Sequence, residues 1–163
     1  MTTYTAFLRI RHPSIDPDEV TTTLGLDPVH AWAAGSAREA AIGGGSRGQH
    51  PDTYWLAPLG DGDWQRPHAG SSADASRTFW PPSRSLPLEA FLLGQTRQLV
   101  AHKAFFARLK AEGATCELAV TLNADERWGL DLPPALLRSL AELNVGFSIE
   151  AVTEAETETP LES

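Results

Sequence analysis

The histidines are the residues of this sequence best suited to binding a metal ion. No two of them stand four residues apart, the spacing that would place two imidazoles on one face of a helix. No Cys-x-x-Cys pair is present either, so the spacing predicts neither a metal site nor a bound cofactor. The histidines are His12, His30, His50, His68 and His102.

Nucleophilic catalysis also finds little support in the residue pattern. The single cysteine, Cys116, alternates with polar neighbours and is expected on the buried face of a strand, where a thiol behaves as a small apolar group. Residues 44–48, Gly-Gly-Ser-Arg-Gly, match Gly-x-Ser-x-Gly by letter, but no clear helix follows them, as a nucleophile elbow would require. Residues 43–48 are rich in glycine but lack the Gly-Lys-Ser/Thr ending of a phosphate loop, so a flexible linker is favoured. We predict no catalytic residues, and enzymatic activity is left open, with a non-enzymatic role preferred.

Tryptophan is frequent in this chain, with five residues among 163. Trp64 and Trp80 fall, with His68, in a long segment at residues 60–86 that is rich in Gly, Ser, Pro and Asp. A loop of this length inside a compact domain is typically functional or mobile. These aromatic residues therefore predict either a ligand pocket beneath the loop or simple packing against the core. Both interpretations remain open at the level of sequence.

The elements that must position these residues are read from hydrophobic periodicity. Strict alternation predicts strands at residues 3–11, 115–123 and 145–152. In the first strand Tyr4, Ala6, Leu8 and Ile10 share the buried face. Asp16 and Pro17 predict the start of a short helix that ends at Gly25, and Pro134 starts another at residues 134–144. Further strands are expected at residues 30–34, 53–59 and 128–132, and helices between residues 88 and 113 with a bend near 100–102.

This order predicts an α+β fold with a mixed or antiparallel sheet and its helices on one face. It resembles a ferredoxin-like βαββαβ unit extended by a further βαβ. We expect one domain over residues 1–152, which includes the long loop, and a disordered acidic tail over residues 153–163. The two ends of the chain have similar patterns, which indicates either an internal duplication or a chance likeness between short amphipathic helices.

The opposite face of the first strand carries Phe7, Arg9 and Arg11. A central position for this strand would place the arginines opposite Glu117 or Glu150. If no helix covers this face, it is either a solvated surface with weak ion pairs or a contact surface, because aromatic residues and arginine are enriched at interfaces. We therefore take Phe7, Arg9 and Arg11, with Trp64, His68 and Trp80, as candidate residues for binding a ligand or a partner.

Net charge narrows the classes of partner. The chain carries 21 acidic and 13 basic residues, a formal net charge of −8, which disfavours binding to nucleic acid. No signal peptide and no membrane-spanning run is apparent, so we expect a cytoplasmic protein that does not bind membranes. A monomer or a homodimer is compatible with the sequence.

Several short runs together resemble a known family. They are Phe7-Leu8-Arg9-Ile10, Asp16-Pro17-Asp18-Glu19-Val20-Thr21 and Leu24-Gly25-Leu26-Asp27-Pro28, followed by Gly35 and Trp55. Over most of residues 3–152 the chain is similar to a bacterial family catalogued as domain of unknown function 4279. The resemblance implies a small cytosolic bacterial α+β domain, and it carries over no catalytic residue, substrate or cofactor.

The sequence as a whole favours a non-enzymatic module that binds another protein, for example an immunity-type inhibitor that masks its target. The alternative is a small-ligand-binding domain or a minor enzyme with a pocket under the 60–86 loop. A third possibility is a purely structural homo-oligomer that associates through the outer face of the sheet. A structure separates these readings, because a ligand pocket requires converging polar groups whereas a protein interface requires a broad accessible surface.

Overall fold

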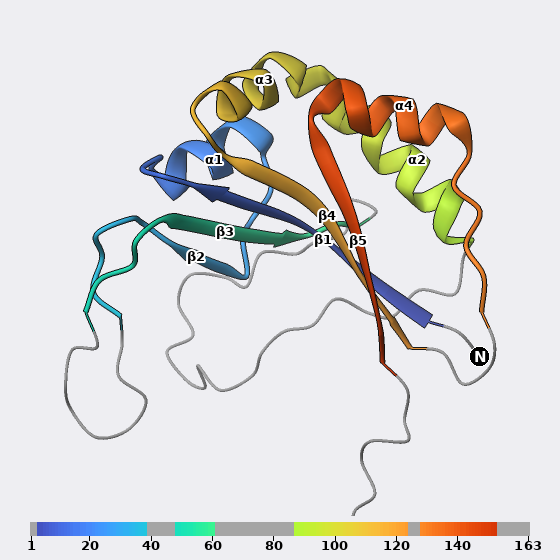
Figure 1. The fold of residues 1–163 in the computed structure, drawn as a ribbon, viewed down its shortest axis with the longest axis horizontal. Helices are drawn as coiled ribbons and strands as arrows, with labels where there is room; N and C mark the ends of the chain where they lie inside the picture. The colour runs from blue at the N-terminus through green and yellow to red at the C-terminus, as the bar shows by residue number, and fades with distance from the viewer. Residues whose placement is uncertain (1–2, 39–47, 61–86, 124–127, 153–163) are drawn as a thin grey trace, which may run out of the picture.

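The computed structural model describes residues 3–38, 48–60, 87–123 and 128–152 (Figure 1). The strands are β1 (Thr3–His12), β2 (His30–Trp32), β3 (Thr53–Pro58), β4 (Thr115–Asn123) and β5 (Val145–Val152). The helices are α1 (Pro17–Leu24), α2 (Leu88–Leu99), α3 (Lys103–Ala111) and α4 (Pro134–Leu143), with a 3-10 turn, η1 (Val100–His102), between α2 and α3. The predicted bend between the two middle helices is therefore confirmed.

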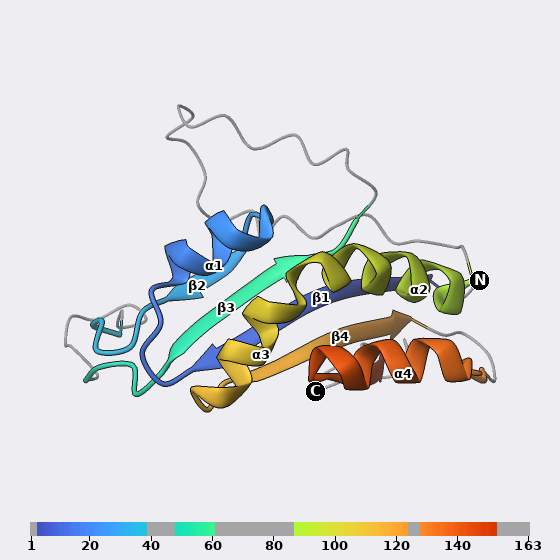
Figure 2. The ribbon, with the colours of Figure 1, turned by 90° about the horizontal axis from the view of Figure 1, so that it is seen from above.

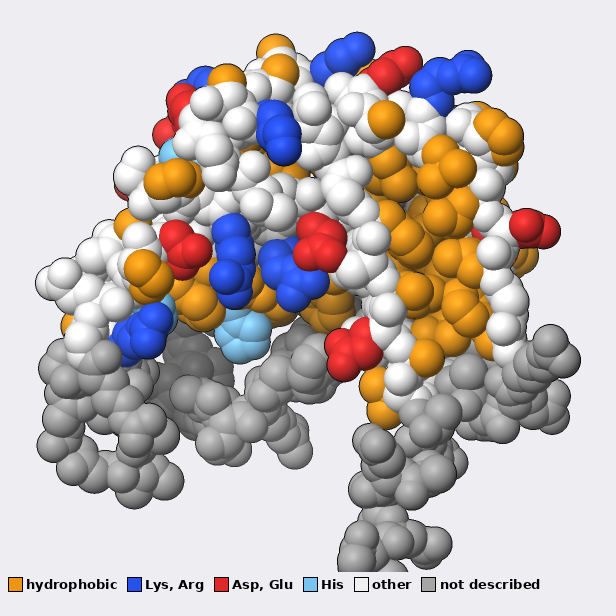
Figure 3. Space-filling view, in the orientation of Figure 1, with side chains coloured by type: hydrophobic (Ala, Val, Ile, Leu, Met, Phe, Trp, Pro, Cys, Tyr) orange, Lys and Arg blue, Asp and Glu red, His pale blue; other side chains and the backbone are white. Residues whose placement is uncertain are grey.

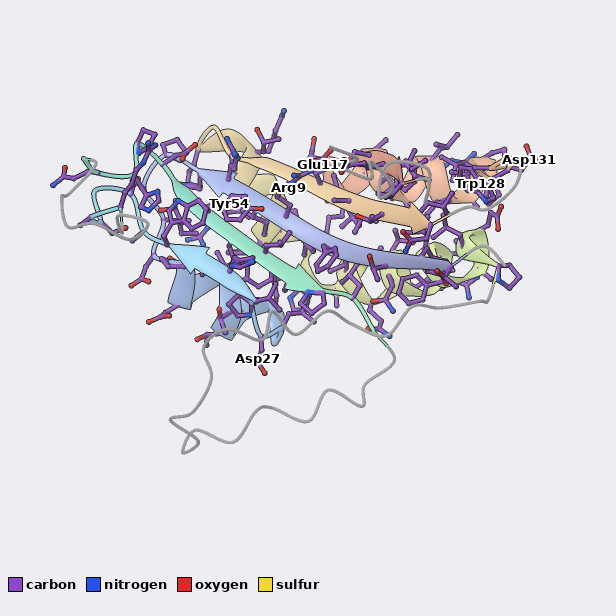
Figure 4. All side chains as sticks on the ribbon, turned by 90° about the horizontal axis from the view of Figure 1, so that it is seen from below. Arg9, Asp27, Tyr54, Glu117, Trp128 and Asp131 are labelled. Atoms are coloured by element: carbon purple, nitrogen blue, oxygen red, sulfur yellow. The ribbon has the colours of Figure 1, made fainter. Side chains whose placement is uncertain are left out.

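The strands form one mixed sheet, and the helices cover one of its faces. Seen from above, the helices lie in front of the strands, with α1 near β2 and β3 and α4 at the opposite margin (Figure 2). Seen from below, the strands face the viewer with no helix in front of them (Figure 4). This two-layer arrangement confirms the predicted α+β class. Within the described residues, no helix has the length and apolar character that crossing a bilayer requires.

The strand order is β2-β3-β1-β4-β5. β1 is antiparallel to both β3 and β4, and β2 is antiparallel to β3. These four strands have the arrangement of a βαββαβ ferredoxin-like unit. The helix α4 then carries the chain to β5, which is parallel to β4 at the sheet margin. The strands joined by α4, β4 and β5, are direct neighbours in the sheet, whereas the strands joined by α1, β1 and β2, are separated by β3. The two similar sequence patterns at the ends of the chain therefore form different strand connections.

The core lies between the sheet and the helices, on the side that the alternation predicts. Leu8, Ile10 and Leu118 are fully buried on this side, with helical residues such as Leu136 packed above them. Trp55 is also fully buried, and its indole Nε1 donates to Thr21 Oγ1 at 3.0 Å, which ties β3 to α1. Trp55 therefore serves as a core residue.

Local sequence signals place the ends of α1 correctly. Asp16 accepts a hydrogen bond from the Asp18 amide at 2.9 Å, and Gly25 has the left-handed φ of 66° that ends the helix. One prediction is wrong, since residues 128–132 form no strand although Trp128, Leu130 and Leu132 alternate with polar or small residues. All three side chains pack against the core from a segment without ladder partners, so the alternation reflects burial alone.

The end of β1 is held by a buried histidine. His12 Nδ1 accepts hydrogen bonds from the amides of Ser14, at 2.9 Å, and Ile15, at 2.8 Å. Because Nδ1 accepts, the ring proton sits on Nε2, which lies 2.8 Å from Glu112 Oε2 at the end of α3. The imidazole thus joins the β1–α1 turn to the C-terminus of α3. Its role is structural.

Two substitutions separate the roles of the two ring nitrogens of His12. In His12→Asn, the amide oxygen can replace Nδ1 as acceptor, whereas His12→Gln keeps a donor near Glu112 but leaves the buried amide of Ile15 without its acceptor. We expect His12→Gln to cost about 1–3 kcal/mol more unfolding free energy than His12→Asn, the range for an unsatisfied buried donor. Urea denaturation measures the difference. The opposite ranking would show that the Glu112 contact dominates.

The single cysteine confirms the expectation of a buried, apolar role. Cys116 lies on the helix-facing side of β4 and is 6% exposed. Burial raises the pKa of the Cys116 thiol to about 11, while the positive charge of Lys110 acts in the opposite direction. The folded protein therefore holds the thiol protonated at neutral pH, and a protonated, buried thiol is a poor nucleophile.

The raised pKa makes the contribution of Cys116 to stability dependent on pH. As the pH rises past the ordinary value of 9.0, the unfolded chain loses the thiol proton while the folded chain keeps it until about 11. Ionisation therefore favours the unfolded state, and stability relative to Cys116→Ala should fall by about 2 kcal/mol across this window. Paired denaturation curves at pH values from about 8 to about 11 measure this fall. A constant difference would contradict the prediction.

Candidate functional site

One face of the sheet, which no described helix covers, carries charged and aromatic side chains from neighbouring strands. The register sets Trp32 beside Tyr54, Tyr54 beside Arg11, and Arg11 beside Thr115. The next row places Arg9 between Leu56 and Glu117. Side chains directly opposite each other on neighbouring strands are close enough to interact. We call this surface, defined by Arg9, Arg11, Trp32, Tyr54, Thr115 and Glu117, the open face.

A stack of rings holds one side of the open face. His50 lies against Trp32, and Trp32 against Tyr54, each pair with ring centroids 4.5 Å apart and nearly parallel planes. The Arg11 guanidinium lies over the Tyr54 ring, with its Cζ 5.6 Å from the centroid. A cation at this distance is attracted by the ring's electron-rich face. The stack therefore holds Arg11 in place while leaving its N–H groups available.

An ion pair holds the other side. Arg9 Nε lies 3.0 Å and Nη2 2.8 Å from the same carboxylate oxygen, Oε2 of Glu117 (Figure 4). The two side chains are 36% and 26% exposed, so water screens the pair and it contributes only about 0–1 kcal/mol to stability. Sequence reasoning offered Glu117 or Glu150 as the partner. The register selects Glu117, because Glu150 lies beside Thr121.

A hollow of about 290 Å³ lies between these two groups, lined by Arg9, Arg11, Thr115 and Glu117. Two guanidinium groups and one carboxylate leave it with one net positive charge, in a chain whose formal net charge is −8. Among the residues that the structure describes, no carboxylate pairs with Arg11. In Figure 3, basic and acidic side chains gather to the left of β5 and below the helices.

The structure brings together only part of the predicted site. Arg9 and Arg11 line one hollow, as just described. Phe7 shares their face by register but is only 5% exposed, so it contributes packing and little accessible surface. Trp64, His68 and Trp80, and with them the pocket expected under the 60–86 loop, lie outside the described residues.

Sequence reasoning missed the ring stack. Trp32 and Tyr54 meet only because β2 pairs with β3 in one register, and His50 joins them from the connecting segment. The long connection between the two strands carries no turn signal that would set this register. Alternation within β3 places Tyr54 on the face opposite to Trp55. This alternation is the sequence signal that indicates which face Tyr54 occupies.

Neither metal binding nor a known family gains support. Among the described residues, no three His, Cys, Asp or Glu side chains come together as a metal site would require. A scan against protein-family models finds no match, and searches of curated proteins and of solved structures find none either. The resemblance to domain of unknown function 4279 stays a prediction from the residues that carry it.

Proposed function

We propose that this protein is a non-enzymatic binding module, and that its open face binds a carboxylate-bearing segment of another protein. The observation that carries this proposal is the state of Arg11. Its side chain is exposed, it lies over Tyr54, and it borders the hollow without a carboxylate partner among the described residues. A guanidinium held in this way has little conformational freedom left to lose on binding. It also offers a planar fork of N–H donors that matches a carboxylate.

The neighbouring ion pair leaves room for such a ligand. Arg9 directs two of its N–H groups to a single oxygen of Glu117, so its remaining donors are not used by that contact. The Thr115 side chain adds a hydroxyl at the rim. An aspartate or glutamate entering the hollow would therefore meet Arg11 directly, Arg9 from the side, and one hydroxyl.

The lining supports a protein segment over a small free molecule. Ligand pockets are concave and mostly apolar, with volumes of about 300–1,000 Å³. At about 290 Å³ the hollow is just below this range, and three of its four lining residues are charged. An acidic side chain that is anchored by its own protein needs only such a shallow site, since the rest of the interface supplies the area.

The overall charge limits the partner further. A net charge of −8 repels a strongly acidic protein at long range, although at physiological salt this repulsion falls off over about 8 Å. The partner we infer therefore has a modest net charge and presents a single Asp or Glu at the contact. This would suit a masking or adaptor role, in which specificity depends on local complementarity.

The test uses labelled nine-residue peptides of alanine and serine with amidated C-termini, which carry from zero to three glutamates as their only carboxylates. Binding is followed by fluorescence anisotropy. We expect binding to require glutamate and to weaken as salt is raised. Arg11→Gln should reduce affinity by about 10- to 150-fold, since charge-assisted hydrogen bonds contribute about 1.5–3 kcal/mol. The thermal midpoint should fall by no more than a few degrees, because Arg11 is exposed and its contact with Tyr54 contributes only about 0.5–1 kcal/mol.

Arg138→Gln is the matched control, because Arg138 is an exposed arginine on α4 and its loss changes the net charge equally. The control should bind as the unmodified protein does. Equal losses in both variants would mean that net charge alone governs binding. Binding that does not depend on glutamate would overturn the assignment of the open face.

A further inference from the structure

β5 is an edge strand with an unprotected outer side. It pairs with β4 from Val145 to Val152 without interruption, and among the described residues no strand pairs with its other side. Natural edge strands usually discourage further pairing through proline, lysine or a bulge. β5 has none of these, and Glu150 is its one charged residue.

An apolar surface adjoins this edge. Among the described residues, the exposed large hydrophobic side chains are Val100, Leu137, Ile149 and Val152, and three of these lie on α4 or β5. Phe147 shares the helix-facing side of β5 with Ile149, whereas Val152 lies on the opposite side by register. Trp128, Leu130 and Leu132 are partly buried against the core. Figure 3 shows a continuous hydrophobic surface between β5 and the segment at residues 128–133, where the layer between sheet and helices reaches the outside.

We propose that a second copy of this chain covers this edge, with the two β5 strands antiparallel about a two-fold axis perpendicular to the sheet. Such an axis keeps the helix layers of both copies on the same side. Because paired side chains must lie on the same face of the joined sheet, the residue numbers of each cross-strand pair must sum to an even value. An axis that passes beside Ser148 or beside Ile149 meets this requirement. The product is one continuous sheet across both copies.

The side chains of β5 are self-complementary in either register. An axis at Ser148 sets Phe147 beside Ile149 of the second copy, and an axis at Ile149 sets Ile149 beside itself. Aromatic and β-branched pairs of this kind stabilise neighbouring strands. Glu150 falls beside Gly146 or Ser148 of the second copy and never beside itself, so no like charges are opposed.

The size of the surface predicts a weak dimer. β5 and its apolar neighbours amount to about a dozen residues per copy, against roughly 20–30 in a standard interface. Two copies with a net charge of −8 also repel each other. Because the contact is apolar and the repulsion is electrostatic, salt should strengthen the association. A basic peptide as the occupant would show the opposite dependence.

Sedimentation velocity from about 1 to about 500 μM tests the proposal, because a small interface associates in this range. Ile149→Lys places a charge in the contact at a position that is already 38% exposed. Val100→Lys is the matched control, since Val100 is 45% exposed on η1, away from the edge, and the charge change is the same. We expect dimerisation of the unmodified protein and of Val100→Lys, and at least tenfold weaker association of Ile149→Lys.

Oxidative cross-linking keeps the test informative if Ile149→Lys fails to fold. Paired residues in antiparallel strands have Cα atoms about 4.5–5.5 Å apart, within disulfide reach. Ser148→Cys or Ile149→Cys, whichever lies on the axis, should form a covalent dimer, and Val100→Cys should not. The proposal is overturned if the unmodified protein stays monomeric throughout, if salt weakens the association, or if neither β5 variant cross-links faster than Val100→Cys.

Discussion

The two hydrogen-bonded ladders of β1 are the interaction on which the rest of the structure depends. β1 pairs with β4 along most of its length and with β3 over its second half. These ladders place Leu8 and Ile10 at the centre of the core, and the same alternation places Arg9 and Arg11 at the centre of the open face. Arg9 and Glu117 are 108 residues apart in the chain, and only the β1–β4 register brings them together.

The elements with strong local signals could be predicted from sequence, and the contacts between distant segments could not. Alternation placed β1, β4 and β5, and the Asp16 and Gly25 caps placed α1, because these signals arise within a few consecutive residues. Residues 128–132 were wrongly predicted as a strand, since burial alone produced the same pattern. Of the site, the two arginines were predicted, whereas the stack of His50, Trp32 and Tyr54 depends on a strand register that a long connection leaves unspecified.

The two proposed contacts, binding of an acidic segment at the open face and pairing of two copies through β5, would reinforce each other. Pairing through β5 would keep the two open faces on the same side of one sheet, so a single assembly would present two hollows in a fixed relation. A partner with two suitably spaced acidic segments, or two partners on one scaffold, would then bind with higher avidity than one hollow allows. A weak dimer could thus be strengthened by the partner, because binding to both copies favours their association.

The central position of β1 also has a consequence for how the chain acquires its structure. On one side, β1 is completed only by β4, which is made more than a hundred residues later. Such long loop closures slow folding, and at synthesis rates of about 5–20 residues per second β1 would wait for at least several seconds with its apolar face uncovered. During that interval Leu8 and Ile10 are natural binding sites for chaperones, a transient exposure that the finished protein no longer shows.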